Sequence, residues 1–192
     1  MSLLEEALEA PQCVVSVMGA HAGEDVDVIF GRKMADCEAT GRTFWVAKSA
    51  KARPRQVQAL CSSGLGHVIF VEPASASGAR PTIEADAATE YSPDRTSWCP
   101  LPEGLGPVTG QIDNSAAAFV FDKLVVETDG VIDLWGYADS SDVSQPLRFN
   151  LGLSSVCAAR EDMSLHPARM KSRYRAVVAV ARLARPYCVW LR

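Results

Sequence analysis

Apolar residues fall in short runs along the chain, and several runs have the composition or period of β-strands. The stretch from Cys13 to Met18 and the segment HVIFVE (67–72) are dense in β-branched residues, as buried strands are. Between Asp25 and Phe30 acidic and apolar residues alternate, which predicts a half-buried strand with its apolar side chains inward. A further strand is expected over 43–47. The pattern therefore predicts a chain rich in β-strand.

Three short segments have helical patterns or helix boundaries instead. The sequence LLEEALEA (3–10) is amphipathic and is followed by Pro11, which predicts a short helix that ends there. A second helix is expected from about Lys33 to Glu38, ending near Gly41. A third is expected over 54–61, because Pro54 is well suited to the first turn of a helix.

The segment FVFDKLVVETDGVIDLWGYAD (119–139) predicts a β-hairpin. Two runs rich in β-forming residues are separated by Asp129 and Gly130, a dipeptide that favours the positive φ angles of a type I′ turn. A two-residue turn at this point pairs Glu127 with Ile132.

The region before the C-terminal residues fits two patterns. As a helix from Pro167 to Arg185, its apolar residues make one continuous stripe at 3.6-residue spacing, beside a ridge of Lys171, Arg175 and Arg182. As a strand, its core RAVVAVARLA alternates poorly between apolar and polar positions. We favour the helix, followed by a closing strand YCVWL.

Together these elements predict an α+β fold: a mostly antiparallel, curved or barrel-like β-sheet with about three helices. The chain has 192 residues, of which 48% are hydrophobic, so residues 1–192 are expected to form a single globular domain. An irregular segment rich in proline and glycine lies at about 73–110.

Further features argue against a membrane-spanning protein, a secreted protein and the common cofactor-dependent enzymes. No apolar run approaches the roughly 20 residues of a membrane span, and the first residues are acidic rather than basic. The six cysteines are 24 or more residues apart, without a CxxC pair, which is typical of buried thiols in a cytoplasmic protein. The motifs GxxxxGK[ST], GxGxxG, HExxH and GxSxG do not occur. We therefore expect neither a metal nor another cofactor.

The formal net charge of −4 conceals a segregation of charge along the chain. From Glu72 to Asp142 there are 13 acidic residues and three basic ones. Residues 39–71 include five basic residues and no acidic residue. After Asp162 there are seven basic residues and again no acidic residue. Such a pattern favours contact with a charged partner.

Few residues qualify for catalysis. His21 lies between the glycines of GAHAGED, where it fits a general base, and Cys61 with His67 fits a thiol–base pair. A polar loop and a structural histidine are the competing interpretations. Two interpretations also exist for the aspartates of the acidic middle region: they are either carboxylates of a hydrolytic site or part of a solvated acidic face. These residues are Asp113, Asp122, Asp133, Asp139 and Asp142.

The segment TFWVAKSAKARPRQVQAL (43–60) combines aromatic and basic residues as single-stranded nucleic-acid binding requires, because aromatic rings stack on bases and cations contact phosphates. The leading hypothesis is therefore a non-enzymatic domain that binds nucleic acid. Its candidate residues are Trp45, Lys48, Lys51, Arg53, Arg55, Lys171, Arg175 and Arg182. The competing interpretation of Trp45 is an inward side chain.

Within this segment, WVAKS (45–49) resembles the opening strand of PUA-like EVE domains, in which a W-x-x-K-S run occurs. The resemblance implies a small barrel associated with modified-base recognition. The residues that follow, AKARPRQVQALCSSGLG, depart from that family's pattern, so no site residue is transferred from it. The alternative to nucleic-acid binding is protein assembly or self-association, in which basic segments of one copy meet the acidic middle of another.

Overall fold

The computed structural model describes residues 1–18, 24–48, 52–62, 64–72, 85–139, 142–146, 155–160 and 174–192. Its helices are α1 (Leu3–Glu9), α2 (Val26–Thr40), α4 (Pro54–Cys61) and the single 3₁₀ turn η1 (Leu134–Gly136). The first strands are β1 (Gln12–Val17), β2 (Thr43–Lys48), β3 (Gly66–Val71), β4 (Asp86–Ala87), β5 (Glu90–Ser92), β6 (Cys99–Pro100) and β7 (Thr109–Gly110). They are followed by β8 (Ala116–Val126), β9 (Val131–Asp133), β10 (Tyr137–Asp139), β11 (Asp142–Pro146), β12 (Ser155–Arg160) and β13 (Tyr174–Leu191).

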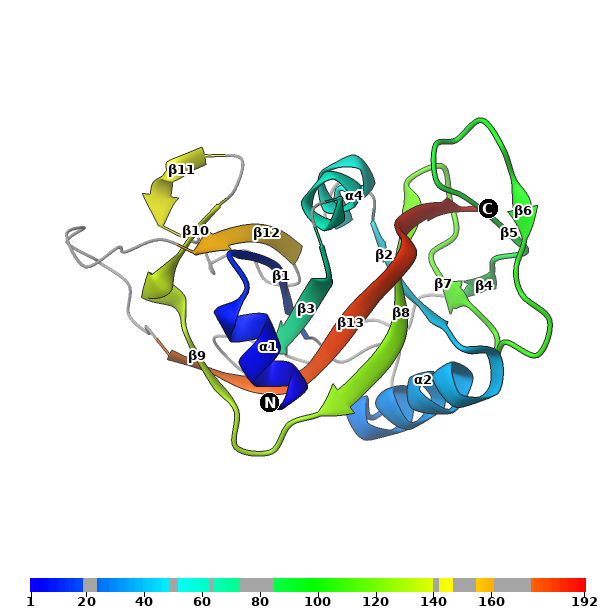
Figure 1. The fold of residues 1–192 in the computed structure, drawn as a ribbon. Coiled ribbons are helices and arrows are strands. Elements are labelled where there is room, and N and C mark those ends of the chain that lie inside the picture. Colours follow the sequence, from blue (N-terminus) through cyan, green and yellow to red (C-terminus); the bar gives the residue numbers. More distant parts are fainter. Residues whose placement is uncertain are drawn as a thin grey trace.

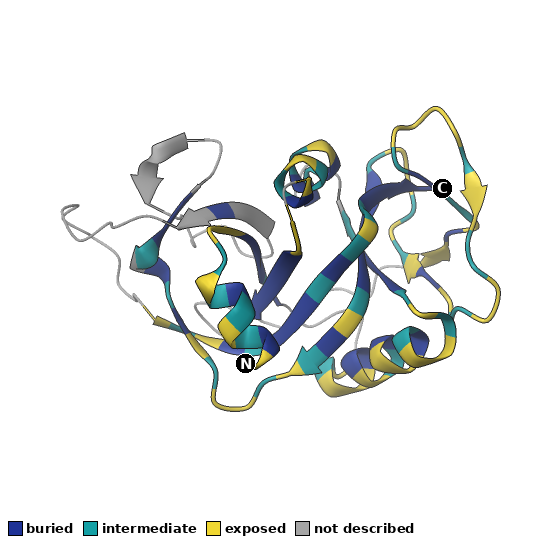
Figure 2. Cartoon of the chain, in the orientation of Figure 1, coloured by how far each residue is buried: buried dark blue, intermediate teal, exposed yellow. Residues whose placement is uncertain are grey.

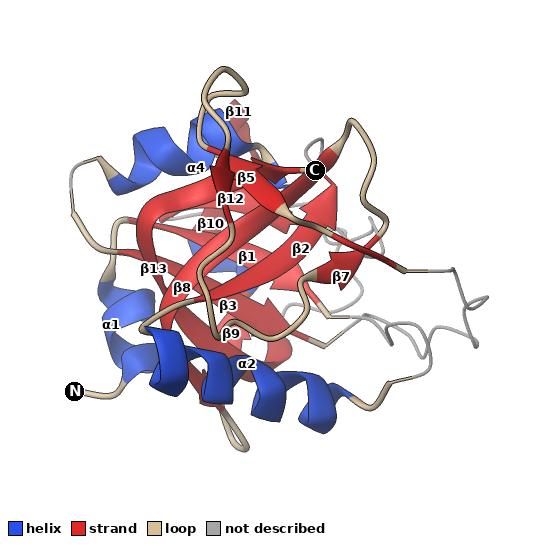
Figure 3. Cartoon of the chain, turned by 90° about the vertical axis from the view of Figure 1, so that its right-hand side faces the viewer, coloured by secondary structure: helices blue, strands red, loops and turns tan. Residues whose placement is uncertain are grey.

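Eleven strands form one mixed, mostly antiparallel sheet, whose main path has the order β11-β10-β12-β1-β3-β13-β5-β6. Strands β8 and β9 also pair with β13, and β2 pairs with β8. The pair β1 and β3 is parallel, and the other described pairs are antiparallel. The sheet curls strongly without closing (Figures 1 and 3). Strands β4 and β7 form a separate two-stranded ribbon. The predicted α+β fold with a curved sheet and about three helices is confirmed.

Both faces of the sheet are covered, which explains why its strands are apolar on both sides. Helices α2 and α4 pack on one face, over a core that contains Phe30, Phe70 and Phe121. Helix α1 covers part of the opposite face, and the segment after Ala85 covers the rest through Val108 and its neighbours. Figure 2 shows the central strands buried between these layers.

Strand β13 is the central strand of this arrangement. Its residues 174–185 were predicted as part of a helix over 167–185, and that prediction is wrong. Strand β13 pairs with β3 and β5 along one edge and with β8 and β9 along the other, over 18 residues. Its alternation is poor because both faces contact apolar layers: Ala179 and Ala181 face α2 and α4, whereas Val177 and Val180 face α1. The predicted closing strand is the end of β13, and residues 167–173 lie outside the described part.

The predicted hairpin over 119–139 is also wrong. Strands β8 and β9 do not pair with each other, since both run antiparallel to β13, β8 with residues 179–190 and β9 with residues 174–176. The amide of Glu127 donates to the Val178 carbonyl, and the amide of Val177 donates to the Gly130 carbonyl. Residues 127–130 are thus a short excursion between two strands that continue in the same direction (Figure 1).

A third correction concerns Asp25–Phe30, predicted as a strand. Asp25 is the N-cap of α2, and the helix begins at Val26. Ile29 and Phe30 are buried, whereas Val28 is 59% exposed, so the burial follows helical rather than alternating spacing. The helix ends at Gly41, whose positive φ of 75° forms the C-cap, in agreement with the predicted end.

The remaining element predictions are confirmed. Helix α1 begins with a capping box between Ser2 and Glu5, and α4 begins at Pro54 and ends at Cys61. Strands β1, β2 and β3 occupy the predicted segments. The described part of the irregular segment, 85–110, contains only the short strands β4 to β7.

Candidate functional site

Trp45, the residue expected to stack on a base, is a core residue. It lies in β2 and is 8% exposed. Its ring centroid is 4.7 Å from that of Phe70 and 5.6 Å from that of Phe30. Stacking on a base requires an open ring face, so this placement supports the competing interpretation of an inward side chain.

The described arginines of the two basic segments, Arg53 and Arg55 in one and Arg182 in the other, lie on different faces of the sheet. Arg53 and Arg55 lie at the start of α4, on the face that α2 and α4 cover. In β13, Ala181 and Leu183 point to that same face, so Arg182 between them points to the α1 face.

Arg182 is moreover engaged with a carboxylate, since its Nε and Nη2 atoms donate to Asp122 at 2.8 and 3.2 Å. Arg175 lies opposite Ile132 in the pairing with β9, near the start of β13. The backbone of Lys48 ends β2, while Lys51 and Lys171 lie outside the described residues.

Cys61 and His67 do not form a thiol–base pair, because their side chains lie on opposite sides of the sheet. Cys61 packs with Val68 on the face of α2 and α4, and burial raises the pKa of its thiol to about 12. His67 is directed toward α1, where its Nε2 atom is 3.8 Å from Glu6 Oε2. Burial also lowers the pKa of His67.

The other candidates for catalysis are dispersed. His21 lies outside the described residues, and Asp113 accepts hydrogen bonds from the amide and hydroxyl of Ser115. Asp122 is paired with Arg182, and Asp133 lies in β9. Asp139 ends β10 and Asp142 begins β11. Across the described ranges no cluster of three or more His, Cys, Asp or Glu side chains is arranged to hold a metal ion.

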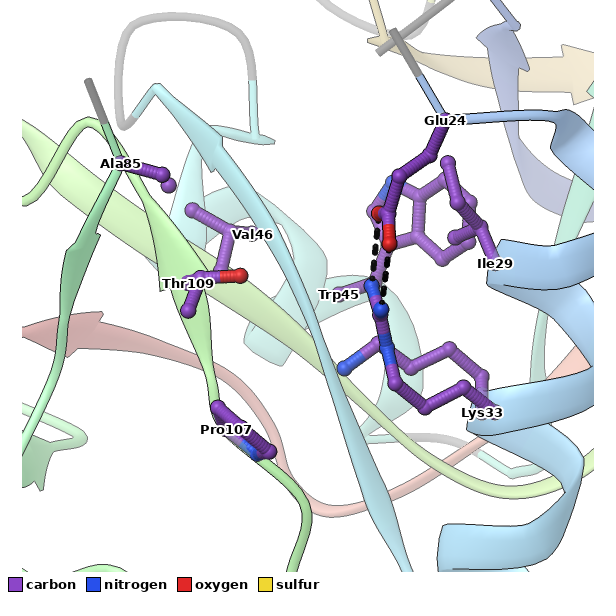
Figure 4. A pocket seen from close by; sticks show the side chains of 10 residues that line it. Glu24, Ile29, Lys33, Trp45, Val46, Ala85, Pro107 and Thr109 are labelled. Carbon is purple, nitrogen blue, oxygen red and sulfur yellow. Dashed lines mark hydrogen bonds and ion pairs between the residues drawn. The ribbon is translucent and has the colours of Figure 1, made fainter. Parts of the chain in front are cut away.

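A pocket of about 70 Å³ lies between α2, the edge strand β2 and the ribbon strand β7. Figure 4 shows Lys33 of α2 and Glu24, which precedes the helix, on one side of it and the side chains of Val46, Ala85, Pro107 and Thr109 on the other. The lining residues are Glu24, Ile29, Arg32, Lys33, Trp45, Val46, Ala85, Pro107, Thr109 and Gly110. Gly110 allows close packing here, because a Cβ at that position would be 2.7 Å from Val46 Cγ1.

Arg32 contributes a guanidinium group to this pocket. Its Nη1 and Nη2 atoms donate to the two carboxylate oxygens of Glu24 at 2.8 and 3.1 Å, and this hydrogen bonding raises the pKa of Arg32. Its Nε atom is buried and has no hydrogen-bond partner among the described residues. A buried donor of this kind favours an additional acceptor, which a ligand or water can supply.

Lys33 contributes a cationic side chain, and the residue is only 6% exposed. Its Nζ atom is 3.7 Å from Asp36 Oδ2, one turn further along α2. Burial lowers the pKa of Lys33, and the Asp36 carboxylate opposes that effect. A lysine in this position gains from any further negative charge in the pocket.

Asp36 fixes Lys33 and connects three parts of the chain. Its carboxylate accepts hydrogen bonds from the Thr43 hydroxyl at 2.8 Å and from the Gly106 amide at 3.0 Å. Helix α2, strand β2 and the segment that precedes β7 are therefore held together at the end of the pocket.

Sequence analysis missed Arg32, Lys33 and Asp36. The available signal was the spacing of Ile29, Phe30, Lys33 and Asp36, which places two charged residues on the buried face of one helix. The prediction of a strand over 25–30 assigned Ile29 and Phe30 to a different element from Lys33 and Asp36. The two charged residues could therefore not be recognised as part of a buried helix face.

Comparisons with protein-family models, with curated proteins and with solved structures gave no match for this chain. No helix in the described part of the chain is long and apolar enough to span a membrane. The pocket combines two cationic groups and the Glu24 carboxylate with an apolar wall. Such an arrangement is suited to binding a small molecule that carries negative charge.

Proposed function

We propose that this protein is a non-enzymatic binding protein that takes a small molecule in the pocket between α2, β2 and β7. The observation that carries this proposal is the Arg32 Nε atom, a buried donor without a hydrogen-bond partner among the described residues, which lies beside the pocket together with the buried Lys33 side chain. Burying such groups costs free energy, and a ligand that accepts their hydrogen bonds offsets that cost.

The shape of the pocket supports binding through a small part of the ligand. With a volume of about 70 Å³ it accommodates a polar head group rather than a whole cofactor. Ile29, Trp45 and Val46 supply apolar walls next to the charged side of α2 (Figure 4).

A fragment screen tests the proposal. Small acids, amines and neutral amides are added to the ¹⁵N-labelled protein, and chemical shifts are followed at the Gly110 amide and the Trp45 indole N–H. We expect at least one fragment class to shift both signals. The variant Thr109→Phe, at an exposed position on the pocket wall, should weaken that binding at least about tenfold by filling the pocket.

Thr128→Phe is the matched control, because Thr128 is also exposed and lies in the 127–130 excursion. It should bind like the parent protein. Equal binding by all three proteins would contradict the proposal, and so would the absence of any shift at Gly110 and Trp45. Nucleic-acid binding stays a prediction, and a labelled oligonucleotide titrated at low and high salt in the same series tests it.

A further inference from the structure

Glu24 shows what kind of group fits the Arg32 guanidinium. The two side chains meet through paired hydrogen bonds of 2.8 and 3.1 Å, each carboxylate oxygen accepting one. A guanidinium presents two parallel donors, and a planar carboxylate matches them in spacing and charge. The Glu24 side chain thus occupies a carboxylate site at the rim of the pocket.

This ion pair is easily exchanged. The side chains of Arg32 and Glu24 are 34% and 42% exposed, and partly exposed ion pairs contribute only about 0–1 kcal/mol. A carboxylate from solution that replaces Glu24 restores the same two hydrogen bonds to Arg32. The carboxylate of the displaced Glu24 is hydrated in exchange, which offsets part of the cost.

The pocket offers an incoming carboxylate contacts beyond the Arg32 guanidinium. A ligand in the pocket brings its negative charge toward Lys33 as well as Arg32, since both line the pocket. It can also place a hydrocarbon part against Ile29 and Trp45. Glu24 lines the same pocket from the residue that precedes the N-cap of α2 (Figure 4).

We infer that the ligand is a small carboxylate with an apolar part, and that Glu24 occupies its carboxylate position on Arg32 until it binds. This inference rests on the proposed function, because it assigns the chemical class of ligand for the same pocket. It also gives Glu24 the role of an internal competitor.

The test uses benzoate as probe, with benzamide as its neutral counterpart and inorganic phosphate as a different anion. Dissociation constants are measured from shifts of the Gly110 amide and of the Arg32 Nε–H. We expect benzoate to bind about fivefold more tightly to the Glu24→Gln variant, the equivalent of about 1 kcal/mol from the lost ion pair. Arg32→Gln should weaken benzoate binding at least about tenfold, and benzamide should bind weakly to all proteins.

Glu38→Gln is the matched control, since Glu38 is exposed on the same helix and its replacement makes the same change in net charge. It should leave benzoate affinity unchanged. Circular dichroism establishes that Arg32→Gln is folded; should it unfold, the Glu24→Gln and Glu38→Gln comparison decides alone.

The outcomes separate this inference from the proposed function. Equal affinity of the parent and Glu24→Gln for benzoate would overturn the role of Glu24 while leaving the pocket as a binding site. Tighter binding of phosphate or benzamide than of benzoate would overturn the carboxylate class. If no fragment of any class shifts the pocket signals, the proposed function itself is wrong.

Discussion

Lys33 and His67 are both buried ionisable side chains, but they lie in different parts of the molecule and have different surroundings. Lys33, in α2, is buried with a carboxylate 3.7 Å away and lines a pocket. His67, in β3 under α1, is 3% exposed, and its two ring nitrogens have no hydrogen-bond partner among the described residues. Its Nε2 atom is 3.8 Å from Glu6 Oε2, and neither this distance nor the 3.7 Å of the Lys33 pair is that of a hydrogen bond.

Burial lowers the pKa of both groups, but their carboxylate partners differ in exposure: the Asp36 side chain is 7% exposed and the Glu6 side chain is 34% exposed. Lys33 is compensated by Asp36, so a charged group suited to ligand binding remains beside the pocket. The Glu6 carboxylate beside His67 is more exposed to water, which screens its charge, and burial favours the neutral form of His67. We therefore assign binding to the α2 region and expect pH-dependent stability from the α1 region.

The largest effect is expected from Asp36→Ala. It leaves the Lys33 ammonium buried without its carboxylate and removes the acceptor of Thr43 and Gly106. The free energy of unfolding should fall by about 3–5 kcal/mol, measured by urea denaturation.

The double variant Lys33→Met with Asp36→Leu should recover more than half of that loss, because no charge then stays buried alone. A loss below about 1 kcal/mol for Asp36→Ala would show that Lys33 does not depend on Asp36.

A smaller, pH-dependent effect is expected from His67→Leu. The unfolded histidine binds a proton below about pH 6.5, whereas the folded one binds it only at lower pH, since burial lowers its pKa. The parent protein should therefore lose stability as the pH falls from 6.5 toward that lower pKa, by at most about 1.4 kcal/mol per pH unit. His67→Leu should lose less over the same range.

Urea denaturation of both proteins between pH 8 and pH 5 measures this difference. A stability difference that stays constant over that range would mean that His67 does not titrate differently in the folded and unfolded states.

The smallest effect is expected from Asp122→Asn, which removes the ion pair with Arg182. Both side chains are about one-third exposed, at 33% and 34%. Because water already screens such a pair, the loss should be at most about 1 kcal/mol and should shrink further in high salt. A loss as large as that of Asp36→Ala would contradict the contrast between exposed and buried pairs.

Local signals predicted the elements whose boundaries are set by local chemistry. Pro54 marks the start of a helix through its fixed φ, and Gly41 marks the end of one because glycine readily adopts a positive φ. The β-branched runs in β1 and β3 need no long-range information. The hairpin failed because Asp129 and Gly130 allow a tight turn without requiring it. Whether β8 folds back or continues depends on β13, a strand more than 40 residues further along the chain.

The candidate site was less accessible to sequence reasoning for a related reason. A tryptophan next to basic residues in the sequence is compatible with stacking on a base and also with a buried position in the core. The direction of the Trp45 ring is decided by its packing with Phe30 and Phe70. The pocket likewise arises where α2 meets β7, two elements about 70 residues apart. Neither the composition nor the spacing of residues in the sequence indicates that α2 and β7 lie side by side.

Strand β13 also has a consequence for the order of folding during synthesis. It follows every other described element in the chain, yet β3 and β8 are joined only through it. Until residues 174–191 have left the ribosome, the apolar edges of β3 and β8 lack their shared partner. Folding of the sheet is therefore expected to wait for this last strand, and the incomplete nascent chain is expected to need protection from aggregation.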